Sequence, residues 1–313
     1  MNKFIVKLAA IIFVNLLITT AGLAQENLFT VIALKGKVSA KATNAGDWKT
    51  INVGDKLFAG DKVKLGAKEY LGIAHTKGKT MELKTEGIFD VNELAAKIKK
   101  ESGTLTKNFT KYLVSEMVVS GNKSKNMTML GAVVRSLANN IKLTVTLNNN
   151  LLNPVLNASW TSLGEGKRYV FRLINPSNKT VYMEILNDTS FTLDMNSFNI
   201  QKDIPYKWFI LGADNSTIVS DTASFSYLSD VKYKPVADSL EQLKSDFEDE
   251  EALLNQLIIA SFFEQHKLYD EAIKVYENIL QQAPDIQMFR QRYIDFLVNN
   301  GFSARAKQIL AQE

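Results

Sequence analysis

Few residues in this chain have the types and spacing that catalysis or metal binding would need. The 313-residue sequence contains two histidines, His75 and His266, and no cysteine. Neither histidine has a second histidine or a carboxylate at the spacing of a metal site, so we expect no metal centre. Glu82 and Glu86 are four residues apart, but in a strand region this offset does not build an acid–base pair, and we interpret both as solvated charges.

The sequence also lacks the motifs of the common enzyme classes. No serine lies in a Gly-x-Ser-x-Gly nucleophile elbow, and there is no phosphate-binding loop or dinucleotide fingerprint. The absence of cysteine excludes cysteine catalysis and zinc–thiolate sites. The net charge of +4 is too small and too evenly spread to indicate nucleic acid or anionic lipid as a partner. We therefore predict a protein that is not an enzyme and needs no cofactor.

The first 24 residues have the pattern of a secretory signal peptide. Lys3 and Lys7 precede an apolar run over residues 8–18, and the small residues Gly22 and Ala24 suit a cleavage site. A retained membrane anchor is the alternative, but the run is shorter than the roughly 20 residues that span a bilayer. We predict a periplasmic or secreted protein, without a lipid anchor because no cysteine follows the signal.

Residues 28–87 form a block in which apolar and polar residues alternate and glycines recur. Alternation is typical of strands with one buried face, and the glycines mark tight turns between them. The residues that match the pattern of a known family are Gly36, Val38, Trp48, Ile51, Gly54, Asp55, Leu57, Gly60, Asp61 and Val63. This block resembles the extracytoplasmic domain of the FecR-like family. The resemblance implies an all-β domain and, as one alternative, a FecR-type signal-transduction component. Only about thirty residues precede the block, so we expect no cytoplasmic anti-sigma segment.

Residues 88–147 are predicted to be a helical bridge that leads into a second β domain. Two helices are expected, over residues 89–98 and 105–119, followed by short strands over 129–134 and 141–147. Seven or so short strands between turn residues then predict a β-sandwich over residues 148–233. The expected strands cover residues 154–156, 158–160, 169–173, 181–185, 190–193, 206–211 and 224–227. Its size and the positions of Trp160, Tyr206 and Trp208 resemble a fibronectin type III or immunoglobulin-like domain.

Residues 236–313 are predicted to be helical and repetitive. A first helix is expected over 236–247, ahead of two helix pairs. The offsets of Ala260, Phe263, Tyr269, Ala272, Tyr276 and Pro284 resemble a tetratricopeptide repeat. Ala306 lies 34 residues after Ala272, which is the period of that family. The fold class is therefore multidomain β + α, with an N-terminal all-β FecR-like domain, a central Ig-like β-sandwich and a C-terminal α-helical repeat.

The resemblance to tetratricopeptide repeats implies a protein-binding groove on the inner face of the first helix of each pair. By the family's pattern the groove residues are Leu254, Leu257, Ser261, Glu264, Gln265, Met288, Gln291 and Asp295, continued by Val298 and Asn299. The alternative is that these positions pack against the rest of the chain, because one full repeat and one truncated repeat are too few to be stable alone.

Three interaction-type modules without a catalytic constellation predict a periplasmic or envelope adaptor or scaffold that binds another protein. Its partner would be another envelope protein or a cell-wall component, and no nucleic acid. A second hypothesis is a peptidoglycan- or carbohydrate-binding protein that uses Trp48, Trp160 or Trp208 on an exposed face. Burial of all three tryptophans would exclude that hypothesis.

Overall fold

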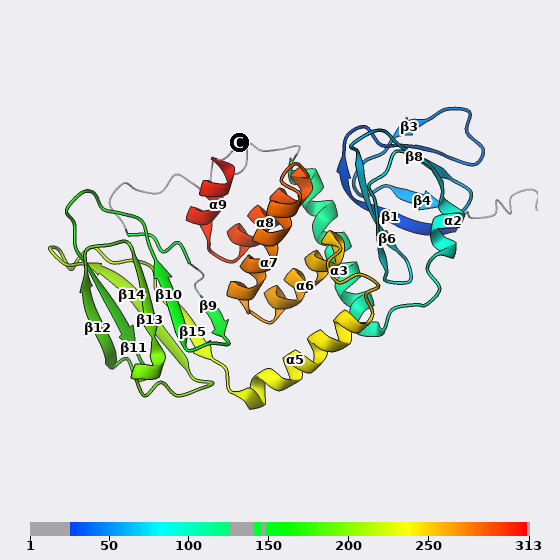
Figure 1. The fold of residues 1–313 in the computed structure, drawn as a ribbon. Coiled ribbons are helices and arrows are strands. Elements are labelled where there is room, and N and C mark those ends of the chain that lie inside the picture. Colours follow the sequence, from blue (N-terminus) through cyan, green and yellow to red (C-terminus); the bar gives the residue numbers. More distant parts are fainter. Residues whose placement is uncertain (1–25, 125–140, 146–147, 312–313) are drawn as a thin grey trace, which may run out of the picture.

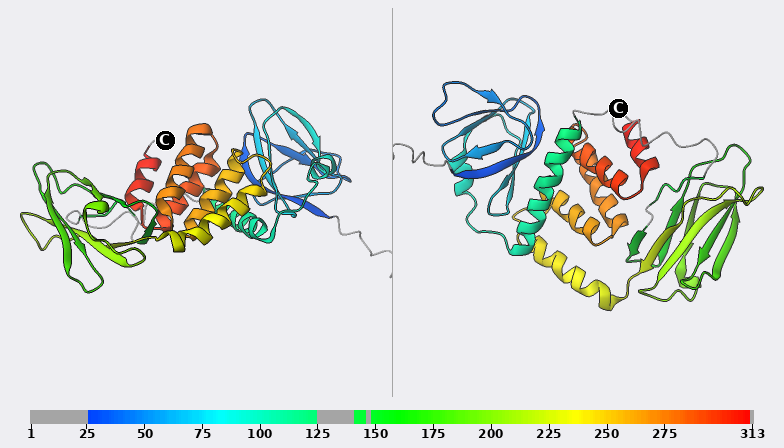
Figure 2. Two further views of the ribbon diagram at one scale, coloured as in Figure 1. Left: turned by 60° about the horizontal axis from the view of Figure 1, so that its bottom comes forward. Right: turned by 180° about the vertical axis from the view of Figure 1, so that it is seen from behind.

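The computed structural model describes residues 26–124, 141–145 and 148–311 (Figure 1). An N-terminal β region and a second β region lie at opposite ends of the molecule, with the helices between them (Figures 1 and 2). The prediction of β sheets in the N-terminal part and helices in the C-terminal part of the chain is confirmed. The predicted signal peptide and the predicted strand over 129–134 lie outside the described residues.

The N-terminal β region consists of two four-stranded antiparallel sheets. The first has the order β4-β1-β6-β7, and its strands are β1 (Asn27–Lys35), β4 (Lys56–Phe58), β6 (Tyr70–His75) and β7 (Thr80–Leu83). The second has the order β3-β2-β5-β8, and its strands are β2 (Ser39–Lys41), β3 (Lys49–Thr50), β5 (Lys62–Leu65) and β8 (Gly87–Asp90). Alternate residues of the strands point into a shared core that includes Phe29, Val31, Val63 and Ile73.

The helix predicted over residues 89–98 is shorter than expected. Phe89 belongs to β8, where it pairs with Val63, and helix α2 covers only Val91–Ala96. The Asp90 side chain accepts a hydrogen bond from the Asn92 N–H, so the helix begins where this carboxylate caps it. The long helix α3 (Thr104–Ser124) extends beyond both ends of the predicted 105–119.

The middle region is a β-sandwich. A five-stranded sheet has the order β12-β11-β14-β15-β9, and a two-stranded sheet pairs β10 with β13. The strands are β9 (Asn148–Leu151), β10 (Val155–Ser159), β11 (Tyr169–Ile174), β12 (Thr180–Leu186), β13 (Ser190–Asp194), β14 (Pro205–Gly212) and β15 (Ala223–Tyr227). Side chains of both sheets, among them Leu156, Phe171, Leu193 and Trp208, share one core. The two sheets therefore pack face to face.

Two strand predictions in this region were wrong in detail. Residues 154–156 and 158–160 were predicted as two strands, but β10 is a single strand because its five residues pair without interruption with β13. Residues 141–147 were predicted as a strand, yet the described residues 141–145 form only one bridge, between Leu143 and Trp160.

A buried tyrosine fixes the segment in which the chain passes from β13 of one sheet to β14 of the other. Tyr206 is buried near the start of β14, and its hydroxyl accepts a hydrogen bond of 3.1 Å from the Gln201 N–H. A tyrosine at this place, bonded to backbone a few residues upstream, is the tyrosine corner of immunoglobulin-like sandwiches. Strand β9 pairs in parallel with β15, whereas the other pairs in this sheet are antiparallel.

The C-terminal region begins with α5 (Asp230–Ser245), which starts before the predicted residue 236 and contains Pro235. Its start is fixed by Ser229, whose hydroxyl accepts a hydrogen bond from the Lys232 N–H. Residues 230–233, assigned by prediction to the sandwich, therefore belong to this helix. Four more helices follow: α6 (Leu253–Gln265), α7 (Tyr269–Gln282), α8 (Gln287–Asn299) and α9 (Ser303–Leu310).

The two helix pairs repeat each other at an offset of 34 residues. Helices α6 and α8 have the same length and begin 34 residues apart, as do the starts of α7 and α9. The turn after α6 contains a bond from the Leu268 N–H to the Phe263 carbonyl, and its counterpart runs from Phe302 to Leu297. Ala272 and Ala306 are both buried, which lets the paired helices approach closely. The sequence period is thus also a structural period.

Candidate interaction surfaces

Six of the eight predicted groove residues are buried inside this chain. Helix α3 packs along α6 and α8 and covers their shared face (Figure 1). Ser120 of α3 donates a hydrogen bond of 2.5 Å to Asp295 of α8, and Met117 of α3 is fully buried in the same core. The covered residues are Leu254, Leu257, Ser261, Met288, Gln291 and Asp295. The prediction of an open groove is therefore corrected, and packing against the chain itself is what the structure describes.

The other two predicted groove residues have different surroundings. Glu264 is partly buried and forms an ion pair with Arg292 of α8. Gln265 is exposed at the end of α6, and so is Asn299 at the end of α8.

A buried charge cluster joins α3 to the helix pairs. Arg292 has no exposed surface, pairs with Glu264, and lies 4.0 Å from a Glu116 carboxylate oxygen of α3. Its guanidinium carbon lies 5.6 Å from the centre of the Tyr276 ring. Burial alone would lower the pKa of Arg292, but the Tyr276 phenol and the Glu264 carboxylate outweigh it and raise that pKa. Arg292 therefore stays charged where α3 meets the helix pairs, between the carboxylates of Glu264 and Glu116.

The N-terminal β region contacts the helices through apolar side chains of β1 and β6 and through complementary charge. Residues 26–111 contain sixteen lysines and ten acidic residues, whereas residues 230–313 contain nine basic and fifteen acidic residues. The charge is thus less evenly spread than the sequence pattern indicated. Lys35 forms an ion pair with Asp285, and Lys79 of β6–β7 donates to the Asp246 carbonyl.

Glu82 has a structural role that its sequence position did not indicate. It was interpreted as a solvated charge, but its side chain is largely buried and accepts a hydrogen bond of 2.8 Å from the Leu254 N–H. That N–H is one of the donors at the start of α6 that have no partner within the helix. A carboxylate is favourable there because the helix dipole is positive at this end. Glu82 on β7 thus caps a helix that follows about 170 residues later, and next to it Thr80 donates to Asn255.

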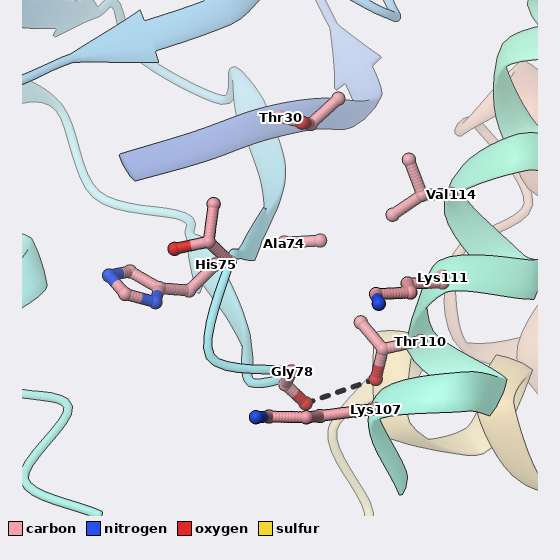
Figure 3. Close-up of a pocket in the computed structure, with 9 residues that line it drawn as sticks. Thr30, Ala74, His75, Gly78, Lys107, Thr110, Lys111 and Val114 are labelled. Atoms are coloured by element: carbon pink, nitrogen blue, oxygen red, sulfur yellow. Dashed lines mark hydrogen bonds between the residues drawn. The ribbon is translucent and has the colours of Figure 1, made fainter. Parts of the chain in front are cut away.

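A cavity of about 280 Å³ lies between β6 and α3 (Figure 3). Thr30 and Ala74 line it from the sheet, and Val114, Thr110 and Lys111 line it from the helix. The Thr110 hydroxyl donates a hydrogen bond to the Gly78 carbonyl, so the proton of this hydroxyl already has an acceptor.

The two histidines have structural roles. His75 lines the cavity, but its ring points away from α3 (Figure 3) and packs edge-on against Phe29 at 4.7 Å. Its Nδ1 accepts a hydrogen bond from the Lys77 N–H, and burial lowers its pKa. His266 stacks on Phe262 at the end of α6. Within the described part of the chain, no group of three or more His, Asp and Glu residues is placed to hold a metal ion.

Two of the three tryptophans are buried. Trp160 and Trp208 lie in the core of the sandwich, where Trp208 stacks on Phe171. Trp48 is 36 % exposed, next to the short strand β3. The carbohydrate hypothesis therefore rests on Trp48 alone.

Part of the outer face of the five-stranded sheet, over β12, β11 and β14, is apolar and exposed, and Lys207 and Ser224 border it. Because side chains alternate along a strand, Phe171 and Leu173 point into the core while their neighbours point outward. Met183 is 55 % and Ile185 is 60 % exposed on the edge strand β12. The cross-strand pairs continue this face over β11 and β14, and its members are Val170, Arg172, Ile174, Val181, Met183, Ile185, Phe209, Leu211 and Val219. We call these nine residues the outer apolar face.

One charged residue lies within the outer apolar face. The guanidinium carbon of Arg172 is 5.9 Å from the centre of the Phe209 ring, and its Nη2 is 3.9 Å from the Met183 sulfur. Arg172 pairs across the sheet with both of these residues. An arginine among apolar side chains and beside an aromatic ring has the composition of a protein-binding hot spot.

The helices of the described residues are too short or too polar to cross a membrane. Searches of family models and of curated proteins gave no match. Similar solved structures include a cell surface anchoring domain, which is 23 % identical over 21 % of this chain and 86 % of its own length, with a TM-score of 0.20.

Two further solved structures contain fibronectin-type domains. The FN1–FN3 domains of chicken CNTN1 are 11 % identical, over 66 % of this chain and 62 % of theirs, with a TM-score of 0.20. The fibronectin(III)-like modules of Clostridium thermocellum CbhA are 10 % identical, over 64 % of this chain and 78 % of theirs, with a TM-score of 0.19. Because all these scores are low, the fold assignment rests on the strand pairing and the core described above.

Proposed function

We propose that this protein is a non-enzymatic adaptor or scaffold of the cell envelope, and that it binds another protein through the outer apolar face. The observation that carries the proposal is the exposure of Val181, Met183 and Ile185 beside half-buried apolar residues of two neighbouring strands. Contiguous exposed apolar surface costs free energy in water, and on folded domains it marks protein–protein contact sites.

The other regions are proposed to support this surface. The strand and turn pattern of residues 28–87 favours a FecR-like module, and the 34-residue period favours a tetratricopeptide-like one. Since α3 fills the face predicted as a groove, the helical region is proposed to act as a spacer that joins the two β regions. The signal-peptide pattern of residues 1–24 supports export to the periplasm or beyond.

The proposal is tested with a chain in which Val181, Met183 and Ile185 are all changed to serine. The full chain and this variant are used to capture crosslinked partners from the organism's own envelope, and the recovered protein is then purified and titrated against both. We expect the serine variant to bind at least tenfold more weakly. The matched control changes the exposed apolar residues Ile88 and Val231, which lie elsewhere, to serine. Equal binding by all three chains would refute the proposal.

Peptidoglycan or carbohydrate binding is the second candidate, favoured only by the exposure of Trp48. An aromatic ring stacked on a sugar would lose its contact when Trp48 is changed to alanine. Co-sedimentation with purified peptidoglycan is the measurement. Binding by the full chain that the Trp48→Ala variant loses would support this candidate, and no sedimentation of either would exclude it.

A further inference from the structure

We propose that two copies of this chain pair through the free edge of β12, antiparallel, with Met183 on the two-fold axis. The inference goes beyond the proposed function, because it concerns the edge of the sheet and a second copy rather than the outer apolar face and a different protein. It is carried by the position of β12 in the sheet and by the order of residues along it.

The edge of β12 is open. β12 is the last strand of the five-stranded sheet, and the only strand it pairs with among the described residues is β11. It also lies at the outer end of the molecule, away from the helices (Figure 1). A free edge presents unpaired backbone N–H and C=O groups that can add another strand.

The middle of β12 lacks the features that prevent a free edge from pairing with a strand of another molecule. Edges are usually protected by lysine, proline or a bulge near the middle of the strand. Between Thr180 and Leu186 there is no proline and no lysine, and Glu184 is the one charged residue. The single register shift against β11 passes over Val181, near the start of the strand. Five of its seven residues, from Tyr182 to Leu186, therefore form a regular ladder with β11.

The order of residues along β12 is self-complementary. In an antiparallel pair of identical strands with Met183 on the axis, Val181 lies opposite Ile185 of the second copy, and Met183 lies opposite Met183. All three outward apolar side chains of each strand then meet apolar partners. Tyr182 lies opposite Glu184 of the second copy, and in each chain its hydroxyl already donates a hydrogen bond to Glu184 of the same strand. Cross-strand pairs of these kinds stabilise a sheet.

Neighbouring registers are less favourable. With the axis at Glu184, two carboxylates would lie opposite each other, and like charges directly opposite destabilise a sheet. With the axis at Tyr182, Ile185 would lie opposite Lys179 of the second copy, so an apolar pair would be lost. The register with Met183 on the axis is therefore the one that the residues select.

The pairing would join two sandwiches into one continuous ten-stranded sheet. Such a contact is isologous, because the same patch is used on both copies, and it closes as a dimer. The two outer apolar faces would then lie side by side and present one wider surface.

Because the chain contains no cysteine, single introduced thiols test the register directly. Met183→Cys places two thiols opposite each other, so a short bis-maleimide is expected to convert most of the chain to a covalent dimer. Val181→Cys is the control. Its thiols would lie four residues apart along the strand, about 13 Å, and are expected to crosslink at least tenfold more slowly. A mixture of Val181→Cys and Ile185→Cys chains is expected to crosslink as Met183→Cys does. Equal crosslinking at all positions, or none, would overturn the proposal.

Sedimentation velocity gives an independent test. The full chain is expected to show the mass of a dimer at micromolar concentration. Met183→Lys places two ammonium groups on the axis and is expected to weaken the dimer at least tenfold, whereas Ile88→Lys, which adds the same charge elsewhere, should not. Circular dichroism checks that each variant is folded. A monomeric full chain at all concentrations would refute the dimer.

A third variant separates this inference from the proposed function. Phe209 belongs to the outer apolar face but lies on β14, two strands away from the free edge. Phe209→Ser is expected to remain dimeric while it binds the partner protein more weakly. If Phe209→Ser stays dimeric and loses the partner, the dimer is shown to be separate from partner binding. If the full chain is monomeric but Phe209→Ser loses the partner, only the dimer is refuted.

Discussion

The helical region and the β-sandwich place polar and apolar side chains in opposite ways. On the face of α6 and α8 that α3 covers, Gln291, Arg292 and Asp295 are buried together with leucines. On the outer face of the five-stranded sheet, Met183 and Ile185 are exposed although they are apolar. Both arrangements cost free energy unless a partner compensates for them, because buried charge needs a counter-charge and exposed apolar surface needs cover.

The two regions differ in which molecule supplies the compensating contacts. Within the helical region the chain supplies it, through Glu264, Glu116 and Ser120. For the sandwich, no described residue of this chain covers the exposed side chains of β12. The first surface is therefore part of the fold, and the second is available to another molecule.

Removing the buried cation should have the largest effect on stability. Arg292→Ala leaves Glu264 and Glu116 without their counter-charge, so we expect a loss of about 4 kcal/mol in the free energy of unfolding. Urea denaturation followed by circular dichroism measures it. Arg290→Ala, on the same helix with one weak contact to a carbonyl, should change stability by no more than about 0.5 kcal/mol. Similar values for both variants would show that the cluster does not stabilise the helical region.

Weakening the packing of α3 against the helix pairs should have the next largest effect on stability. Leu113 on α3 is fully buried against the helix pairs, and Leu113→Ala is expected to cost about 3 kcal/mol through lost contacts and a cavity. Val119 is exposed on the same helix, so Val119→Ala is the matched control. Thermal unfolding measures both. If Leu113→Ala were as stable as the control, α3 would not be an integral part of the helical core.

The junction of α5 and α3 should depend on pH. Burial alone would raise the pKa of Asp246, but hydrogen bonds from the Thr106 hydroxyl and the Gly103 N–H outweigh it and lower that pKa. A lowered carboxyl pKa stabilises the folded state above the ordinary value of about 3.9, and this stabilisation is lost as the pH falls through the folded-state pKa.

Asp246→Asn should therefore cost about 1–2 kcal/mol at pH 7, and its deficit should shrink as the pH falls below about 4. Urea denaturation at pH 7, 5 and 3 measures this. A deficit that is the same at every pH would show that the charge of Asp246 contributes nothing.

Changing the outer apolar face should have the smallest effect on stability. Met183→Ser is expected to alter the free energy of unfolding by no more than about 0.5 kcal/mol, because the side chain is already in water. Leu173→Ala, on the neighbouring strand but facing the core, should cost several times more. A large loss for Met183→Ser would mean that this face contributes to the fold and is not a free surface.

Local patterns predicted the elements of the sandwich well. Strands predicted over 169–173, 181–185, 190–193, 206–211 and 224–227 each lie within the observed β11 to β15. Alternation and turn residues are local signals, so they could be read from the sequence. The boundaries that depend on pairing were wrong: Phe89 joins a strand because Val63 lies opposite it, and β10 is one strand because β13 continues alongside.

The sites were predicted less well than the elements. The groove residues were located on the correct helices, but their burial depends on α3, which precedes them by more than a hundred residues. The outer apolar face was missed, although the alternation of Val181, Met183 and Ile185 with Tyr182 and Glu184 is visible in the sequence. An alternating strand shows that two faces differ, and only the packed sheet shows which one faces the core.

The sequence by itself determined the strands and helices, the 34-residue period and the absence of cysteine, because these depend on residue type and local spacing. The tertiary structure decided which surfaces are covered. Glu82 caps α6, α3 fills the face of the helix pairs, and β12 is left at the edge of its sheet. Each of these depends on contacts between segments far apart along the chain. Hydrophobic burial and charge pairing depend on the distance between groups in space and not on their separation in the sequence.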